Sequence, residues 1–175
     1  LFAYRSNYTT FLTGFFREAQ TIGQVLLISF DDTKMIALFG AADLKVTREE
    51  VCNWLKADDD KDYKSCQDVQ LATFLNGLIN DRRGKREGEQ PKPEEKLTNN
   101  IILKKLQIAL NLKADDVLDL MKLVNFRLSK HELSAFFRKS DHKHYRICKD
   151  QVLRNFLQGV QQDLRGEVEP ELESE

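Results

Sequence analysis

Apolar residues recur at helical spacing in the second half of the chain. After a run of capping types at 98–100, the apolar positions that share one helical face are Ile102, Leu103, Leu106 and Leu110. This pattern predicts a helix over residues 99–111. A second helix is predicted from Lys113 to about Asn125, with apolar residues at Val117, Leu118, Leu120, Met121 and Val124.

Capping signals and apolar spacing predict two more helices. Ser129 and Glu132 match a capping box, in which the serine hydroxyl accepts from the amide three residues on and the carboxylate accepts from the serine amide. The third helix begins there and carries Leu133, Phe136 and Phe137. After a polar loop, the fourth helix carries Leu153, Phe156, Leu157 and Val160.

The chain repeats itself at an offset of 82 residues. Residues 43–79 align without a gap on residues 125–161, with ten identities in 37 positions. A self-match at a fixed offset is typical of a duplicated structural unit. Thr47 and Glu50 repeat the capping box in register. The sequence therefore predicts an all-α fold of two tandem helical repeats, each of about four helices.

The repeated identities include the pairs Tyr63/Tyr145, Asp68/Asp150 and Gly77/Gly159. A glycine in a helix interior costs ~1 kcal/mol relative to alanine, so its recurrence indicates close helix approach or a kink. We expect the tyrosine to anchor the polar loop on the helices and the aspartate to cap the fourth helix. A duplicated binding motif is the alternative interpretation.

Composition divides the chain into five segments: 1–20, an atypical N-terminal extension; 21–80, the first repeat; 81–96, a charged linker with two prolines and two glycines; 97–166, the second repeat; and 167–175, an acidic tail. The first helix of the first repeat is the weakest part of the match, because Thr21 to Phe30 aligns only if the offset changes by one. The longest apolar run, Val25 to Ile28, is far too short to span a bilayer, so we expect no membrane segment.

Charge is distributed unevenly between the two repeats. Residues 21–80 carry 6 basic and 10 acidic side chains, a net charge of -4, whereas residues 97–166 carry 13 and 7, a net charge of +6. The tail adds five glutamates and no base. A basic repeat can bind a polyanion, or it can pair with the acidic half of its own chain.

Metal, cofactor and catalytic signatures are weak. Asp58, Asp60 and Asp62 resemble the start of a calcium loop, but the glycine and glutamate that such a loop requires are replaced by Tyr63 and Val69. The possible transition-metal ligands match no standard spacing: His131, His142, His144 and Cys148. No phosphate loop, nucleophile elbow or paired-carboxylate motif is present. We expect no metal, no cofactor and no enzymatic activity.

The three cysteines indicate a reducing compartment. Cys52, Cys66 and Cys148 are odd in number and show no CxxC or disulfide-rich spacing, so all three are expected to be thiols. This predicts a cytoplasmic protein.

Nucleic-acid binding is the specific alternative to a protein-interaction role. The second and third helices of the second repeat, joined by a short turn at 125–129, have the outline of a helix-turn-helix, with His131, Arg138 and Lys139 assigned to its third helix. The candidate polyanion-contacting residues are Arg138, Lys139, Lys143, Arg146, Lys149 and Arg154. Two helices joined by a tight turn are, however, common in helical proteins without this role.

Longer motifs resemble a known bacterial family. LTNNIILKKLQIALNLKADDVLDLM, LSKHELSAFFRKSDHKHYR and CKDQVLRNFLQG are similar to the YehS-like family, a family of unknown function with two tandem copies, and VTREEVCNWLK and LATFLNGLINDRRGK match its first copy. The resemblance covers about residues 30–166. It implies a small bacterial cytosolic protein and brings no functional residue. We therefore expect a non-enzymatic interaction module with an unknown protein partner, and nucleic-acid binding through the basic second repeat as the alternative.

Overall fold

The computed structural model describes residues 31–57 and 59–166. Within these ranges the chain forms helices and no strands: α2 (Asp32–Ala41), α3 (Arg48–Leu55), α4 (Asp68–Arg83), α5 (Asn99–Ala109), α6 (Ala114–Leu123), α7 (Lys130–Phe136) and α8 (Asp150–Gly166). The predicted all-α fold of two repeats is confirmed. The predicted N-terminal extension, the first helix of the first repeat and the acidic tail lie outside the described residues.

The helices keep the 82-residue offset of the sequence. α2 and α6 have identical bounds after the shift, and α3 and α7 begin at equivalent residues, as do α4 and α8. Asp43 and Asn125, also equivalent, both have a positive φ, at 63° and 56°. Aspartate and asparagine are among the few non-glycine residues that adopt this left-handed conformation readily. Each repeat therefore leaves its second helix by the same turn.

Both predicted capping boxes are confirmed. In the first repeat the amide of Glu50 donates to Thr47 Oγ1 (3.2 Å) and the amide of Thr47 donates to Glu50 Oε2 (2.8 Å). In the second, Glu132 and Ser129 exchange the same pair of bonds at 3.2 and 3.1 Å. These bonds satisfy amides that the first turn of a helix leaves without backbone partners.

The repeated glycines mark a close approach of two helix backbones, one of the two alternatives that the sequence leaves open. A Cβ placed on Gly77 would lie 1.8 Å from the carbonyl oxygen of Leu38 in α2. A Cβ on Gly159 would lie 2.3 Å from the carbonyl oxygen of Leu120 in α6, the residue equivalent to Leu38. Neither site has room for a larger residue, so α4 packs on α2 as α8 packs on α6.

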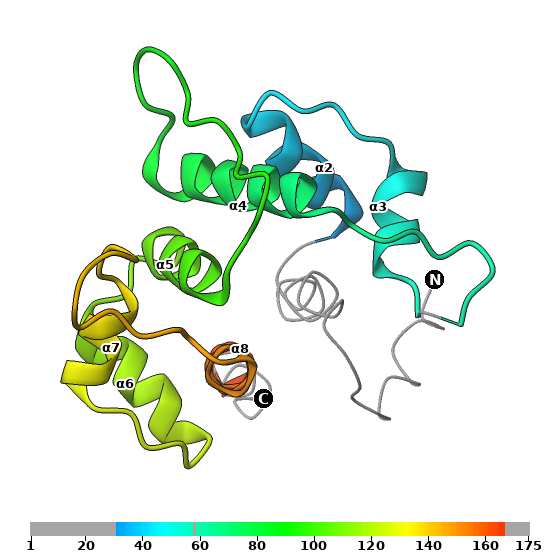
Figure 1. Ribbon diagram of the computed structural model, residues 1–175. Helices are drawn as coiled ribbons and strands as arrows, with labels where there is room; N and C mark the ends of the chain where they lie inside the picture. The colour runs from blue at the N-terminus through cyan, green and yellow to red at the C-terminus, as the bar shows by residue number, and fades with distance from the viewer. Residues whose placement is uncertain (1–30, 58, 167–175) are drawn as a thin grey trace, which may run out of the picture.

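One continuous apolar core runs through both repeats. α4 packs against α2 on one side and against α5 on the other, and α8 packs mainly against α6. Figure 1 shows α5 between α4 and the remaining helices of the second repeat. In the first repeat the Phe39 ring lies 5.5 Å from Trp54 and 5.2 Å from Phe74. α5, the first helix of the second repeat, therefore also packs against the first repeat.

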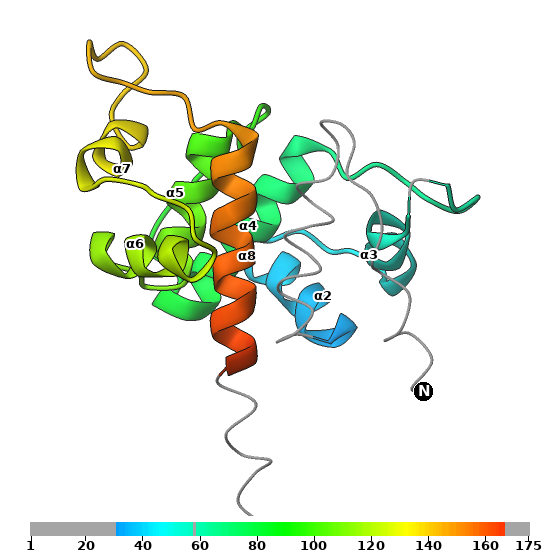
Figure 2. The ribbon, with the colours of Figure 1, turned by 90° about the horizontal axis from the view of Figure 1, so that it is seen from below.

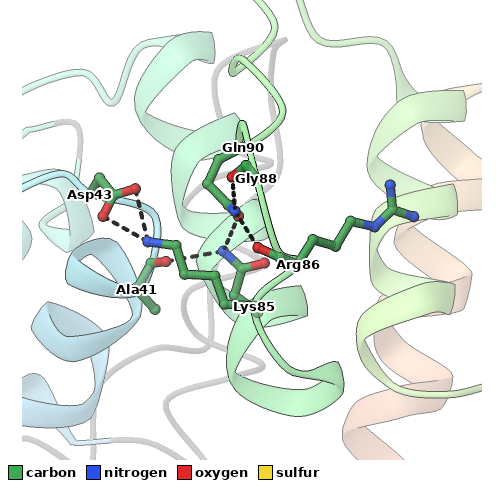
Figure 3. A network of polar contacts seen from close by, with 7 residues as sticks. Ala41, Asp43, Lys85, Arg86, Gly88 and Gln90 are labelled. Carbon is green, nitrogen blue, oxygen red and sulfur yellow. Dashed lines mark hydrogen bonds and ion pairs between the residues drawn. The ribbon is translucent and has the colours of Figure 1, made fainter.

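Polar contacts fix the segment between α4 and α5, residues 84–98, which we call the connecting segment. Lys85 forms an ion pair with Asp43 (2.8 Å), and the Gln90 side chain donates to the carbonyl oxygens of Arg86 and Gly88 (2.7 and 3.2 Å) (Figure 3). Farther along, Lys105 of α5 forms an ion pair with Glu94 (2.9 Å). The connecting segment is thus tied both to the first repeat and to α5.

Two details differ from the sequence interpretation. Residues 81–83, assigned to the linker, form the last turn of α4. Asp68 and Asp150 do not cap the fourth helix but lie in its first turn, where Asp68 accepts from the amide of Leu97 (2.9 Å) and Asp150 from the side chain of Asn99 (2.7 Å). Both carboxylates therefore tie a fourth helix to the N-terminal end of α5.

Candidate functional site

Five of the six candidate basic residues belong to the loop between α7 and α8. Arg138, Lys139, Lys143, Arg146 and Lys149 lie in the loop that joins these helices, and Arg154 lies in the second turn of α8. All are exposed except Arg138, which is half-buried. We call these six residues the basic surface. Figure 2 shows this loop at one end of α8, with the C-terminal end of the helix on the opposite side of the molecule.

The helix-turn-helix prediction is wrong in one essential point. α7 ends at Phe136, so Arg138 and Lys139 follow the helix instead of lying on it. The amide of Phe137 donates to the carbonyl oxygen of Ser134 (3.3 Å), a tighter turn than the α-helical one, and the helix stops there. Lys130, which α7 does expose, pairs with Asp115 of α6 (2.6 Å). The cations are presented by a loop and not by a recognition helix.

Intramolecular ion pairs leave most of the basic surface free. Arg146 lies 3.6 Å from Glu132, and the other five residues have no ion pair within residues 31–57 and 59–166. Across the same residues, no ion pair joins a cation of the second repeat to an acid of the first. The alternative that the basic repeat neutralises the acidic repeat of its own chain is therefore not what the described structure shows.

The first repeat keeps only part of this surface, because Lys56, Lys61 and Lys64 are basic and the other three equivalent positions are not. Lys56, equivalent to Arg138, pairs with Asp62 (3.1 Å) and Asp60 (3.7 Å) of its own loop. The position equivalent to Lys149 is Gln67, and the position equivalent to Arg154 is Ala72, which is fully buried. Of the six equivalent positions only Lys61 and Lys64 also carry exposed cations without an ion pair among the described residues, so the larger cluster of such cations is on the second copy.

Apolar and acidic groups interrupt the basic surface. Ile147 stands 72% exposed within the loop, where the first repeat has Ser65. An open hollow in the loop is lined by Phe137, Arg138, Lys139, Asp141, His142 and Lys143. Asp141 is exposed in the loop, whereas Asp115 and Asp119 of α6 pair with Lys130 (2.6 Å) and Lys122 (2.7 Å). The surface thus combines cations with an aliphatic group and one carboxylate.

Asn100 holds this loop in place. Its side chain, 6% exposed, donates to the carbonyl oxygens of Phe136 (2.9 Å) and Arg146 (2.8 Å) and accepts from the amide of Cys148 (2.9 Å). The sequence marks Asn100 only as a helix-capping type, and the cap itself is Thr98, which accepts from the amide of Ile101 (3.3 Å). Its long-range role has no local signal.

The possible metal ligands do not come together. The rings of His142 and His144 are 5.6 Å apart, and the described residues hold no group of three or more His, Cys, Asp or Glu side chains that could bind a metal. Burial, with a smaller effect of the neighbouring aspartate, raises the pKa of Cys66 and of Cys148 to about 12. Both thiols therefore stay protonated at neutral pH, which makes them poor nucleophiles and poor metal ligands. Of the candidate calcium ligands, Asp58 lies outside the described residues.

The fold and the surface define an all-α protein of two tandem copies with an exposed cationic loop on the second copy. The chain belongs to the family described as "Protein of unknown function (DUF1456)", whose model matches residues 26–84 and 99–166. It is 38% identical to the "Uncharacterized protein YehS" of Escherichia coli (strain K12) over 135 residues, which cover 77% of this chain and 86% of the relative. No solved structure matches. The resemblance to the YehS-like family is confirmed.

The descriptions of the family and of the relative name no activity. Over residues 31–57 and 59–166, none of the helices combines the length and the apolar character that a bilayer crossing requires.

Proposed function

We propose that this protein is a non-enzymatic interaction module of the bacterial cytoplasm and that it contacts an acidic partner through the basic surface of its second copy. The observation that carries the proposal is the exposure of cations that have no counter-ion among residues 31–57 and 59–166. Five like charges held on one loop and helix end repel one another, so a partner that neutralises them gains free energy. The three thiols fit a reducing compartment.

The neighbours of these cations favour a protein partner. An exposed aliphatic group such as Ile147 gains by burial against another apolar group, at about 25 cal/mol per Å² of area removed from water. Asp141, exposed within the loop, would repel a continuous phosphate backbone but can pair with a cation of a protein. A protein surface with acidic and apolar groups therefore fits the loop best.

Nucleic acid is the second candidate, favoured by the number of unpaired cations. Each phosphate neutralised by a lysine or arginine contributes a slope of about -0.9 to the dependence of log K on log salt for duplex DNA. A protein that uses this surface should therefore lose DNA affinity steeply as salt rises.

The experiment compares two matched triple variants. Lys139, Lys143 and Lys149 are replaced by Gln in the loop variant, and Lys92, Lys104 and Arg127, exposed cations elsewhere, in the control. Both variants lose three positive charges. We expect proteins captured from a lysate of the source cells to be lost with the loop variant and retained with the control, before and after nuclease treatment. A serine at Ile147 should weaken the same captures.

The same variants decide the alternative. If DNA is the partner, filter binding should show a salt slope that is smaller by about 2–3 in the loop variant than in the control. Equal capture and equal salt slopes for the two variants would contradict the basic surface as the contact.

A further inference from the structure

The chain that follows α4 covers that helix. The connecting segment turns back at Gly84 and runs along α4 towards its N-terminal end. Its hydrogen bonds follow one another in order: Asn80 with Gln90 (3.4 Å), Asn76 with Pro91 (3.5 Å) and Asp68 with Leu97 (2.9 Å). Together with α5, this segment leaves Ala72 at 0% and Asn76 at 9% exposure. In the first copy, the segment that follows the fourth helix therefore returns along it and covers one of its faces.

The equivalent face of α8 is uncovered among the described residues. Arg154 and Gln158, which replace Ala72 and Asn76, are both exposed. At the spacing 4, 4 and 3, four exposed residues share one face of the helix, and we call them the α8 stripe: Arg154, Gln158, Gln162 and Arg165. Lys149 immediately precedes the helix. The stripe carries two positive charges and no carboxylate. Asp163 falls on a different face, and Asp150, four residues before Arg154 on the same face, accepts from the side chain of Asn99 (2.7 Å).

The chain that follows α8 is suited to this stripe. Gly166 is equivalent to Gly84, and the nine residues after it contain five glutamates and no base. Arg154 lies 12 residues before Gly166, a distance of ~18 Å along a helix, whereas nine extended residues reach ~30 Å. The segment can therefore return along α8 as far as Arg154, and close to Lys149.

The charges of the α8 stripe and of the segment that follows α8 are opposite, whereas those of α4 and the connecting segment are not. In the first copy the covered positions are neutral and the connecting segment has mixed charge. In the second copy position 154 is arginine, and all the charged residues of the following segment are acidic. We propose that residues 167–175 dock antiparallel along the α8 stripe, with their glutamates against Arg165, Arg154 and Lys149. By doing so, they compete with an external polyanion for one end of the basic surface. The competition rests on the proposed function; the docking does not.

The test changes the charge of the tail and keeps its length. In the tail variant Glu167, Glu169, Glu171, Glu173 and Glu175 become Gln. The control variant removes five exposed carboxylates that have no ion pair among the described residues: Glu49→Gln, Asp59→Asn, Glu87→Gln, Glu89→Gln and Glu95→Gln. Both variants are full chains with the same change of net charge. Amide NMR spectra then report the docking, and binding of a labelled DNA oligonucleotide and of a labelled polyglutamate peptide reports the competition.

The tail variant should shift the amide signals of the α8 stripe, whereas the control variant leaves them in place. A tethered segment acts at an effective concentration of about 1 mM, so releasing a weakly docked tail should raise probe affinity roughly 2- to 10-fold. Unchanged stripe signals in the tail variant would overturn the docking. Shifted signals with equal probe affinities would overturn the competition. Shifted signals with no binding of either probe to any chain would support the docking and contradict the proposed function instead.

Discussion

The close contact at Gly77 gives the most direct test of the duplicated packing. In Gly77→Ala the new methyl group would lie 1.8 Å from the carbonyl oxygen of Leu38. An ordinary contact needs about 3.5 Å, so α2 and α4 would have to separate by roughly 1.5 Å. The obstacle is backbone and cannot move away by a change of rotamer. The helices must therefore shift, and the apolar contacts between them loosen.

Two opposing terms set the size of the effect. Forcing a methyl group into a packed interface costs typically 1–3 kcal/mol, and a backbone obstacle places this site at the upper end. Alanine regains about 1 kcal/mol of helix propensity over glycine. We expect Gly77→Ala to lower the free energy of unfolding by about 2 kcal/mol. Gly159→Ala, with its contact at 2.3 Å, should cost less, about 1 kcal/mol.

Gly40 provides the matched control within the same pair of helices. It lies in α2, and a Cβ placed on it would meet nothing within 4 Å. Gly40→Ala should therefore raise the free energy of unfolding by up to ~1 kcal/mol. Urea unfolding measures all three variants, with circular dichroism for the whole chain and fluorescence of Trp54, the single tryptophan, for the first repeat. A Gly77→Ala protein as stable as wild type would refute the reasoning.

Three further predictions concern the loop and its supports. Asn100→Ala should lower the free energy of unfolding by roughly 2–4 kcal/mol, because buried backbone groups lose their partners; a loss under ~1 kcal/mol in thermal unfolding would contradict this. Bonds from the Ser129 side chain and amide lower the pKa of Glu132, so its stabilising effect is complete above the ordinary glutamate pKa and is lost as pH falls through the lowered value. Ser129→Ala should therefore reduce the acid-induced fall in Tm, and an unchanged pH profile would count against it. With their pKa values at about 12, Cys66 and Cys148 should resist iodoacetamide near neutral pH until urea is added; fast labelling of either thiol, located by mass spectrometry, would refute their protonated state.

Local signals account for what the sequence predicts well. A capping box such as Ser129 with Glu132 depends on residues three apart, and a helix face depends on residues three and four apart, so both can be read without the fold. Gly77 was also informative, because a glycine in a helix interior has a cost that close packing offsets. These signals are enough to predict the helices and their duplication, and to offer close helix packing at Gly77 as one of two alternatives.

Long-range contacts account for what the sequence does not predict. Asn100 bonds to groups 36 to 48 residues away, and nothing near it in the chain distinguishes it from a capping residue. Apolar periodicity predicts a helix that continues through Phe137 and includes Arg138, whereas α7 ends at Phe136. The counter-ion of a basic residue can likewise be far from it in the sequence and is brought close only by the fold. Charge counts therefore do not show which cations of the second repeat have no ion pair among the described residues.

The exposed face of α8 explains part of the charge on the second copy, but not all of it. A repeat unit whose outer face meets water carries polar residues there, whereas the equivalent face under a neighbouring unit is apolar or neutral. Glutamine meets this need, as it does at Gln158 and Gln162. Solubility therefore requires neither arginine at 154 nor an unpaired cluster of cations on the adjoining loop, and unpaired like charges carry a repulsive cost in the folded protein. A bound anionic group, whether the tail or a partner, would offset that cost, and this excess charge is what separates a binding surface from an ordinary exposed helix.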